Sequence, residues 1–333
     1  MIRYLIERIT FWFYVLILLL VFTGMGSYFL LSRDLPQLPL DLGKINLSLS
    51  TEIYSVDGKR IKVLGQRYPV LLEDISSNFT RAIIAAEDSS YYSHKGLDHR
   101  GLLRALYMNL KEGKVLQGGS TITQQLSKNL FFSFERNWVR KIKELLIAFQ
   151  LEATFSKDKI LETYCNQIYF GNGAYGIEEA SQTYFRKSAR DLSVLQGALL
   201  AGLPNSPNHA NPFKNYKRAM TRAEYVLQRM VNENLISLDE KNNALSSELE
   251  LTKPREDDNP NRYFVDYVLA KLEKKYGKEF VHFGGLKVFT TLDTRLQSFA
   301  QKSALSHLQA LESEIKSDGK KEYLQVGMVS IEN

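Results

Sequence analysis

Residues 117–129, QGGSTITQQLSKN, combine a predicted helix start with an uncharged polar face. The two glycines free the backbone, and either Ser120 or Thr121 can cap the helix that follows. An apolar stripe at helical spacing would bury one side: Ile122, Leu126 and Leu130. Another side carries Thr121, Gln125, Lys128 and Asn129. One mobile cation among neutral hydrogen-bonding groups suits a polar ligand with a phosphate, whereas the alternative is an ordinary surface face.

An acidic pair lies upstream, after a predicted helix that ends at Ala86. Glu87 and Asp88 could be solvated end residues, or Glu87 could be a carboxylate at the edge of a cleft that acts as a general base. His94 follows seven residues after Glu87, without the i, i+4 histidine spacing of a zinc-binding helix. We therefore expect His94 to hold this loop in shape.

A predicted helix with a basic start lies downstream, in VRKIKELLIAFQLE, residues 139–152. Arg140 and Glu144 are spaced i, i+4, which predicts a surface ion pair worth about 0.3–0.5 kcal/mol. Arg140, Lys141 and Lys143 oppose the helix dipole at this end. A helix that carries such charges could use them to bind an anion. The unfavourable interaction with the dipole is only tenths of a kcal/mol, so this pattern alone is a weak indication.

The N-terminal region contains a long apolar run. Residues 9–32 carry no charged side chain, and as a helix of about 36 Å they would cross a hydrocarbon core of about 30 Å. Arg3 and Arg8 precede the run, so the positive-inside rule predicts a single-pass anchor with a cytoplasmic N-terminus. The alternatives are a buried core helix and a cleaved signal peptide, but the run is long for a signal peptide and no A-x-A site follows.

The composition is that of a folded, mildly basic protein. Among 333 residues, 43 Lys and Arg against 37 Asp and Glu give a net charge of +6, and 44% of residues are hydrophobic. The single cysteine, Cys165, excludes an internal disulfide framework and a cysteine-rich zinc module. A basic balance favours an anionic partner. Because the predicted anchor places most of the chain outside the cytoplasm, we expect anionic lipid or a lipid-linked phosphate, and no nucleic acid.

The pattern along the chain predicts a mainly α protein with small β elements in the flanking regions. Apolar residues recur at i, i+3, i+4 spacing from about residue 80 to residue 250. Asp57-Gly58 predicts a hairpin, 286–293 reads as a strand, and 323–333 reads as the start of another strand. We expect four regions: a cytoplasmic tip and transmembrane anchor (1–33), a tether and hairpin (34–74), a helical domain (75–250), and a linker with a first strand (251–333).

Five segments, in order, resemble the motifs of the peptidoglycan glycosyltransferase domain of penicillin-binding proteins, glycosyltransferase family 51. They are EDSSYYSHKGLD (87–98), QGGSTITQQLSKN (117–129), RKIKE (140–144), KDKILETYCNQIYFGNGAYGIEEASQTYFRK (157–187) and LQGALLAGLPNSPNHANP (195–212). The chain departs from the family pattern at Cys165, where Leu is usual, at Gln196, where Glu is frequent, and at Asn205, where Lys or Gln is common.

The resemblance continues toward the C-terminus. GGLKVFTTLDTRLQ (284–297) is similar to the linker before the transpeptidase domain of the bifunctional class A proteins, and 323–333 resembles the first strand of that domain, cut short. Ser-x-x-Lys occurs at Ser156 and Ser317, but no Lys-Thr-Gly accompanies it. The resemblance therefore implies a truncated bifunctional protein, and we expect no transpeptidase activity in this chain.

By resemblance, the helical domain is lysozyme-like and two-lobed and polymerises lipid II into β-1,4 glycan chains. The donor would be a glycan chain on a polyprenyl pyrophosphate, and the acceptor would be the 4-hydroxyl of a GlcNAc, with inversion at the sugar carbon. The resemblance makes Glu87 the general base. It makes Glu144 the second acid, which would orient Arg140 or Lys128 or hold a divalent metal, Mg or Mn.

The remaining site residues receive supporting roles by the same resemblance. Lys128 and Arg140 would hold the pyrophosphate, where negative charge develops. Donor sugars or phosphate would be positioned by Thr121, Gln125 and Asn129. His94 and Asp88 would support the loop that carries Glu87.

The implied setting is the bacterial inner membrane, with the catalytic domain on the periplasmic side. Expected partners are lipid II, the lipid-linked glycan chain, membrane lipid, other cell-wall synthesis proteins and inhibitors of the moenomycin type. Two other functions stay open: a lytic transglycosylase or lysozyme-like enzyme that cleaves glycan, and a non-catalytic membrane-tethered scaffold. Lys128 and Arg140 argue against the first, because glycan cleavage has no pyrophosphate to neutralise, and Glu87 argues against the second.

Overall fold

The structure is a computed structural model that describes residues 8, 10–16, 18–19, 22–23, 26, 32–42, 50–65, 67–112, 119–132, 137–207, 209–252, 259–317 and 326–327. The chain divides into two compact units. The first, called here the helical unit, comprises Met1–Ile45 and Tyr68–Thr252. The second, called the sheet unit, comprises Asn46–Arg67 and Lys253–Asn333.

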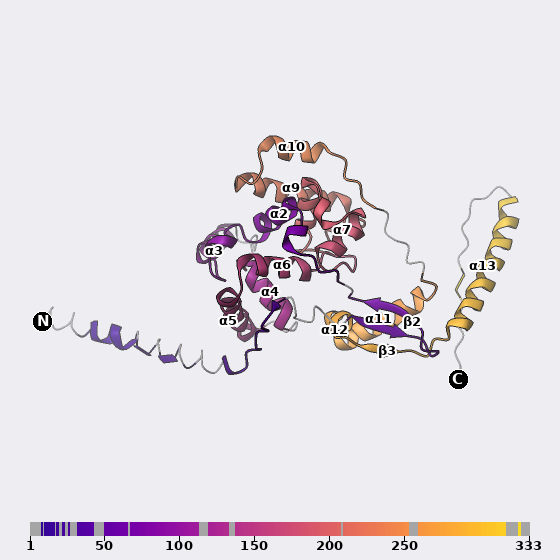
Figure 1. Ribbon diagram of the computed structural model, residues 1–333, viewed down its shortest axis with the longest axis horizontal. Helices are drawn as coiled ribbons and strands as arrows, with labels where there is room; N and C mark the ends of the chain where they lie inside the picture. The colour runs from indigo at the N-terminus through magenta and orange to yellow at the C-terminus, as the bar shows by residue number, and fades with distance from the viewer. Residues whose placement is uncertain are drawn as a thin grey trace. The chain divides into compact units, whose positions relative to one another are not determined.

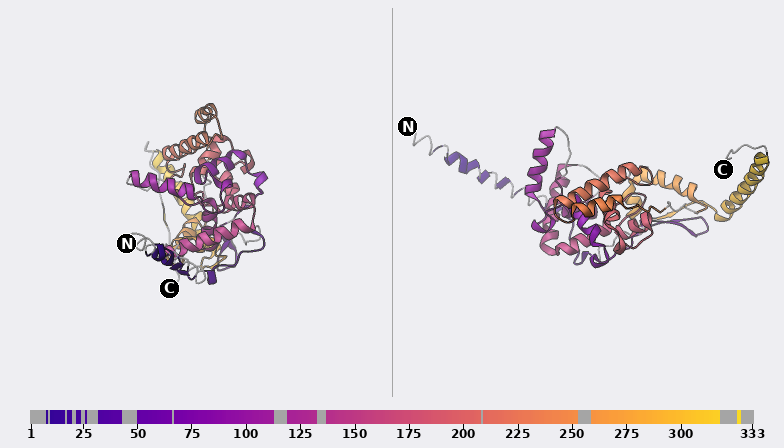
Figure 2. Two further views of the ribbon diagram at one scale, coloured as in Figure 1. Left: turned by 90° about the vertical axis from the view of Figure 1, so that its left-hand side faces the viewer. Right: turned by 90° about the horizontal axis from the view of Figure 1, so that it is seen from above.

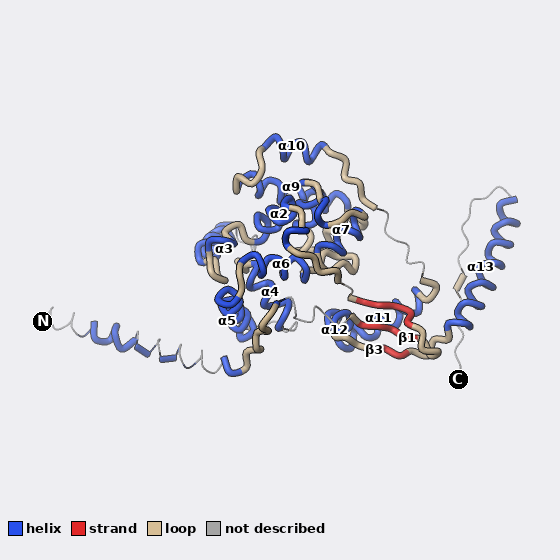
Figure 3. The backbone as a smooth tube through the Cα atoms, viewed as in Figure 1, coloured by secondary structure: helices blue, strands red, loops and turns tan. Residues whose placement is uncertain are grey.

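The helical unit confirms the mainly α prediction (Figures 1 and 3). Its α-helices are α2 (Ser77–Glu87), α3 (His99–Glu112), α4 (Ile122–Phe131), α5 (Trp138–Thr154), α6 (Lys157–Gln167), α7 (Ile177–Phe185), α8 (Val194–Gly202), α9 (Tyr216–Asn232) and α10 (Leu238–Ser246). Short 3-10 turns lie at η2 (Leu72–Asp74), η3 (Tyr91–Ser93) and η4 (Ala189–Asp191).

The core of this unit forms where α2, α4, α6, α8 and α9 pack together. Helix α8 is buried from Leu195 to Gly202, because its residues are apolar or small except for Gln196, whose side chain completes the capping box with Ser193. Gly197 lets α8 approach α2 closely, since a Cβ there would meet the backbone of Asn78 at 3.0 Å. The predicted stripe of α4 is confirmed in its first two members: Ile122 and Leu126 have no exposed surface. These contacts hold α4 and the C-terminal end of α2 in fixed positions.

Part of the predicted tether belongs to the helical core. Leu42 is completely buried in that core, and Leu35 and Leu38 pack against it. Asp34 lies 3.7 Å from the Lys143 ammonium on α5. The segment from residue 34 to residue 42 is therefore packed against the helices.

The sheet unit is a small α/β assembly. Its strands are β1 (Thr51–Tyr54), β2 (Arg60–Leu64) and β3 (Lys287–Phe289), and its helices are α11 (Arg262–Tyr276), α12 (Lys278–Phe283) and α13 (Thr294–Ser317). The strand order is β2-β1-β3. The predicted hairpin around Asp57-Gly58 is confirmed, because β1 and β2 pair antiparallel, and β3 pairs parallel to β1. A small core of Ile53, Leu64, Val265 and Val281 closes the unit. Helix α13 is a single long helix, drawn in yellow in the right-hand view of Figure 2.

The pairing of β1 with β3 joins two regions that the sequence pattern assigns to separate parts of the chain, the hairpin and the C-terminal linker. Among the described residues, no helix is both long and apolar enough to cross a membrane. The predicted anchor over 1–33 is described only in part, and the predicted strand over 323–333 lies outside the described residues except at 326–327.

Candidate active site

The carboxylate of Glu87 lies at the C-terminal end of α2, between two amide donors. Gln125 on α4 donates through Nε2 to Glu87 Oε2 at 2.8 Å, and Asn205, after α8, donates through Nδ2 to Oε1 at 2.7 Å. Burial raises the pKa of Glu87, while the Gln125 hydrogen bond and the charges of Arg222 and Lys128 oppose that rise. Glu87 is therefore a carboxylate of increased basicity within reach of neutralising charge.

The next residue, Asp88, joins the Glu87 loop to the start of α4. Its carboxylate accepts a hydrogen bond from the backbone N–H of Ile122 at 3.0 Å and lies 2.9 Å from His94 Nε2. An acidic group is favourable at this position because the N-terminus of a helix is positively polarised. Thr121 caps α4 and also donates to the Gly96 carbonyl at 2.8 Å. The structure thus brings the predicted residues Asp88, His94 and Thr121 together behind Glu87.

The second predicted acid, Glu144, lies on α5 with a side chain only 2% exposed. The Arg140 guanidinium lies 3.0 Å from Oε1, and the Lys141 ammonium donates to Oε2 at 3.2 Å. Lys141 also donates to Ser120 Oγ at 2.9 Å, which connects α5 to the segment before α4. Because the carboxylate is buried, the pair is more than the exposed surface ion pair that the i, i+4 spacing predicts.

Helix α4 is the element that links these groups (Figure 1). Thr121, at the start of the helix, lies next to Ile122, whose N–H donates to Asp88. Further along the helix, Gln125 donates to Glu87, and Lys128 adds positive charge near Glu87. Lys128 and Asn129 are exposed at the C-terminal part of the helix. Within the described residues, Asn129 forms no hydrogen bond to the other predicted site residues.

Four residues of the site lay outside the predicted set: Lys141, Tyr164, Asn205 and Arg222. Tyr164 on α6 donates its hydroxyl proton to Gln125 Oε1 at 3.1 Å, and Arg222 on α9 supplies charge near Glu87. The basic run of α5 already contained Lys141, and Asn205 stood out as a departure from the family pattern. Nothing in the local pattern around Tyr164 or Arg222 indicated a place near Glu87.

Divalent-metal binding at Glu144 does not fit the side chains around it. Hard cations take several oxygen ligands, whereas both oxygens of Glu144 face a cationic side chain. Within the part of the chain that the structure describes, no three His, Cys, Asp or Glu side chains converge. The metal implied by the family resemblance stays a prediction without a set of residues to hold it.

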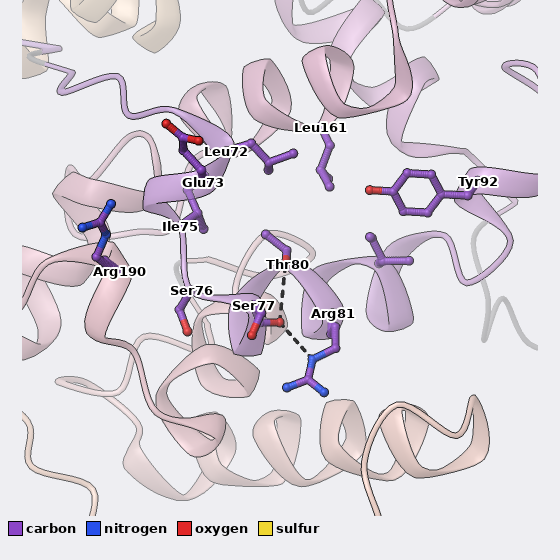
Figure 4. Close-up of a pocket in the computed structure, with 11 residues that line it drawn as sticks. Leu72, Glu73, Ile75, Ser76, Ser77, Thr80, Arg81, Tyr92, Leu161 and Arg190 are labelled. Atoms are coloured by element: carbon purple, nitrogen blue, oxygen red, sulfur yellow. Dashed lines mark hydrogen bonds between the residues drawn. The ribbon is translucent and has the colours of Figure 1, made fainter.

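A separate cavity of about 560 Å³ lies along α2, and its lining includes none of the predicted site residues (Figure 4). Leu72, Ile84 and Leu161 supply apolar surface, and the cavity contains the guanidinium of Arg81. Arg81 already donates to three partners, the Ser77 carbonyl, the Leu235 carbonyl and Asn78 Oδ1. Arg190 also lines the cavity and pairs with the Asp74 carboxylate. Because both lining cations already have partners, the cavity gives no support for a second anion site.

The helical fold and the buried Glu144 beside Arg140 and Lys141 are compatible with the glycosyltransferase class indicated by the sequence motifs. Comparison with known families indicates the same class. The profile of the transglycosylase family matches residues 57–231, and the chain belongs to this family, glycosyltransferase family 51. The resemblance stated from the five motifs is thereby confirmed.

The similar proteins include two called penicillin-binding protein 1A. The protein of Vibrio cholerae serotype O1 is 38% identical over 316 residues, which cover 92% of this chain and 37% of that protein. The protein of Aquifex aeolicus is 42% identical over 256 residues, which cover 76% of this chain and 35% of that protein. A crystal structure of penicillin-binding protein 1A from Haemophilus influenzae is 28% identical, with a TM-score of 0.42, and covers 77% of this chain and 29% of that one. The chain thus spans about a third of the length of these relatives.

Proposed function

We propose that the chain is a peptidoglycan glycosyltransferase that polymerises lipid II into β-1,4 glycan chains for the bacterial cell wall. The observation that carries this proposal is the Glu87 carboxylate, which two amides hold close to the charges of Lys128 and Arg222. Membership of the transglycosylase family supports the same reaction class.

The acceptor half of the reaction uses Glu87 as general base. Burial makes the carboxylate more basic, while its hydrogen bonds and neighbouring cations favour the ionised form that can accept a proton. Glu87 takes the proton of the acceptor GlcNAc 4-hydroxyl as that oxygen bonds to the donor sugar carbon. Attack comes from the face opposite the pyrophosphate, so the α linkage is replaced by a β linkage.

The donor half of the reaction uses the cations. The bond from the sugar carbon to the pyrophosphate oxygen breaks, and the pyrophosphate leaves with the electron pair. Lys128 and Arg140 neutralise the charge that develops there, and Glu144 holds Arg140 and Lys141 in place. Thr121 and Asn129 position donor sugar or phosphate, and Asp88 and His94 fix the loop behind Glu87.

The setting belongs to the same proposal. A lysozyme-like, two-lobed catalytic domain lies on the periplasmic face of the inner membrane, held by a single transmembrane segment within residues 1–33. Such an anchor keeps the site at the surface where lipid II and the lipid-linked glycan chain reside. Other cell-wall synthesis proteins and moenomycin-type inhibitors are the further partners that this setting implies.

The test is incubation of the chain with lipid II, with analysis of the product for glycan polymer. Glu87→Gln is expected to form no polymer while lipid II binding survives, and Glu73→Gln, which changes an exposed carboxylate on η2, is the control. Near-normal polymer from Glu87→Gln would contradict the base assignment. Cleavage of polymeric glycan would favour a lytic enzyme, and neither activity would favour a scaffold.

A further inference from the structure

Three side chains from three helices form one chain of hydrogen bonds that ends at Glu87. The Tyr164 hydroxyl on α6 donates to Gln125 Oε1 on α4 at 3.1 Å. Gln125 then donates from Nε2 to Glu87 Oε2 on α2 at 2.8 Å. Tyr164 has no exposed surface, and its ring belongs to the helical core. Packing of the buried ring therefore fixes the position of the hydroxyl within hydrogen-bond distance of Gln125 Oε1.

The direction of these bonds matters because a glutamine amide has two different ends. One end donates and the other accepts, and rotation by half a turn exchanges them. With Oε1 turned toward Glu87, the amide would present an acceptor to a carboxylate, and the bond would be lost. A donor at the other end of the amide prevents this rotation.

Tyr164 is suited to be that donor. Burial raises the pKa of Tyr164 well above its usual range, and the nearby negative charge of Glu87 adds to the rise. The phenol therefore keeps its proton over the whole range in which Glu87 titrates. Because Oε1 of Gln125 accepts the hydrogen bond from this hydroxyl, Nε2 faces Glu87.

We propose that Tyr164 is a positioning residue for Glu87, which it orients through the amide of Gln125. The inference rests on the proposed function, in which Glu87 is the general base. Tyr164 itself does not contact the substrate in this account. Its role is to keep the Nε2 donor of Gln125 directed at the Glu87 carboxylate.

Other groups act on Glu87 and must stay constant in a test. Asp88 is a neighbouring negative charge, Lys128 on α4 and Arg222 on α9 are positive, and Asn205 donates to the second carboxylate oxygen. Substitution of Tyr164 by Phe removes one hydroxyl and changes none of these charges. Loss of the Gln125 donor removes an interaction that favours ionised Glu87, so the pKa of Glu87 must rise.

The experiment compares Tyr164→Phe with Tyr184→Phe in the full chain. Tyr184 is a matched control, because it is equally buried and its hydroxyl also donates one hydrogen bond, to the Phe170 carbonyl at 2.9 Å, away from the site. For Tyr164→Phe, the acidic limb of the kcat profile for lipid II polymerisation should move up by about one pH unit. The loss in kcat should then be about tenfold below the limb and should vanish at high pH, with KM within about twofold. Tyr184→Phe should leave the limb where it is.

A double substitution distinguishes positioning from a general structural effect. In a Gln125→Ala background, Tyr164→Phe should produce no further shift of the limb, because its route to Glu87 is already gone. An equal shift in both backgrounds, or an unmoved limb in a folded Tyr164→Phe protein, would overturn the inference.

A readout without turnover separates this inference from the proposed function. The carboxyl carbon of Glu87 can be titrated by NMR in 13C-Glu-labelled protein, with the signal assigned by its absence in Glu87→Gln. A higher pKa of Glu87 in Tyr164→Phe than in the parent supports positioning even if lipid II gives no polymer. An unchanged pKa contradicts positioning even if polymer forms.

Discussion

Asn205 gives the Glu87 carboxylate its second donor, across 118 positions of sequence. A neutral amide can donate without adding charge, so Asn205 can orient the carboxylate without bringing a cation to it. The family resemblance places Lys or Gln at this position. In this chain the shorter amide still reaches Oε1 at 2.7 Å.

We predict that Asn205→Asp raises the pKa of Glu87, because a second carboxylate beside the first disfavours the ionised form. A raised pKa means that the base is lost at a higher pH, so the acidic limb of the kcat profile should move upward. At a pH below the limb, activity should fall about tenfold for each unit of that shift. The measurement is polymerisation against pH. A limb that stays in place would show that Asn205 does not act on Glu87.

Glu144 is a buried acid between two cations, and its charge rather than its shape should matter. Glu144→Gln keeps the volume but leaves Arg140 and Lys141 without their counter-charge. We expect kcat for lipid II polymerisation to fall about 100-fold, a size typical of lost electrostatic stabilisation at a reacting centre. Glu162→Gln, which breaks the pair with Lys159 on α6, is the control and should keep most of the activity. A mild effect of Glu144→Gln would reduce its role to that of an ordinary ion pair.

The local sequence predicts only part of the arrangement around Glu87. Glu87, Asp88 and His94 are close in sequence, and their joint position could be predicted. The helical spacing places Gln125 on the polar face of α4, but it does not predict the hydrogen bond from its amide to Glu87. The partners of Gln125 come from α2 and α6, and a helix face cannot show which neighbour will cover it.

Helix α4 is fixed at its start by a capping box. The Thr121 side chain accepts from the Gln124 N–H, and the Gln124 side chain accepts from the Thr121 N–H. The carboxylate of Asp88 satisfies one more backbone donor, that of Ile122. The cap therefore holds the first turn of α4 and the Glu87 loop as one piece.

We predict that Thr121→Val lowers the free energy of unfolding by about 1–2 kcal/mol, the usual size for a lost cap, and also lowers polymerisation. Ser237→Ala removes the equivalent capping box at α10 and serves as the matched control. It should cost stability of a similar size but leave polymerisation unchanged. Denaturant unfolding and polymer yield measured on both variants would check this. Equal activity loss in the two variants would contradict a special role for the α4 cap.

The elements themselves were largely predictable, because α4, α5 and α6 carry clear helical spacing and the Asp57-Gly58 turn marks the hairpin. The pairing of β3 with β1 was not, since it joins positions 235 apart, as in the hydrogen bond from Leu286 N–H to Thr51 Oγ1. No local pattern records which distant strand will be the partner.

The segment before the hairpin, residues 34–42, is part of the helical unit. Leu42 has no exposed surface, whereas Leu40, two positions earlier, is fully exposed. The Pro-containing composition of this segment predicts a tether. The sequence does not indicate the burial of Leu42, because its apolar neighbours come together only in the folded core. The segment therefore contributes burial free energy to the helices it contacts.

We predict that Leu42→Ala destabilises the helical unit by about 2–5 kcal/mol, as expected for a large-to-small change in a core. Leu40→Ala removes the same atoms from an exposed position and should change stability by less than about 0.5 kcal/mol. Thermal unfolding of the two variants is the measurement. Similar melting temperatures for both would show that residues 34–42 do act as a free tether.

The order of strands in the sheet has a consequence for synthesis on the ribosome. Strand β1 is made early, but its parallel partner β3 is made only after the whole helical segment from Tyr68 to Thr252 has been translated. Domains fold as units while the chain is still growing, and non-local strand pairing is slow. The helices can therefore assemble while one edge of β1 is still unpaired. The nascent chain carries this open strand edge until residue 289 has left the exit tunnel.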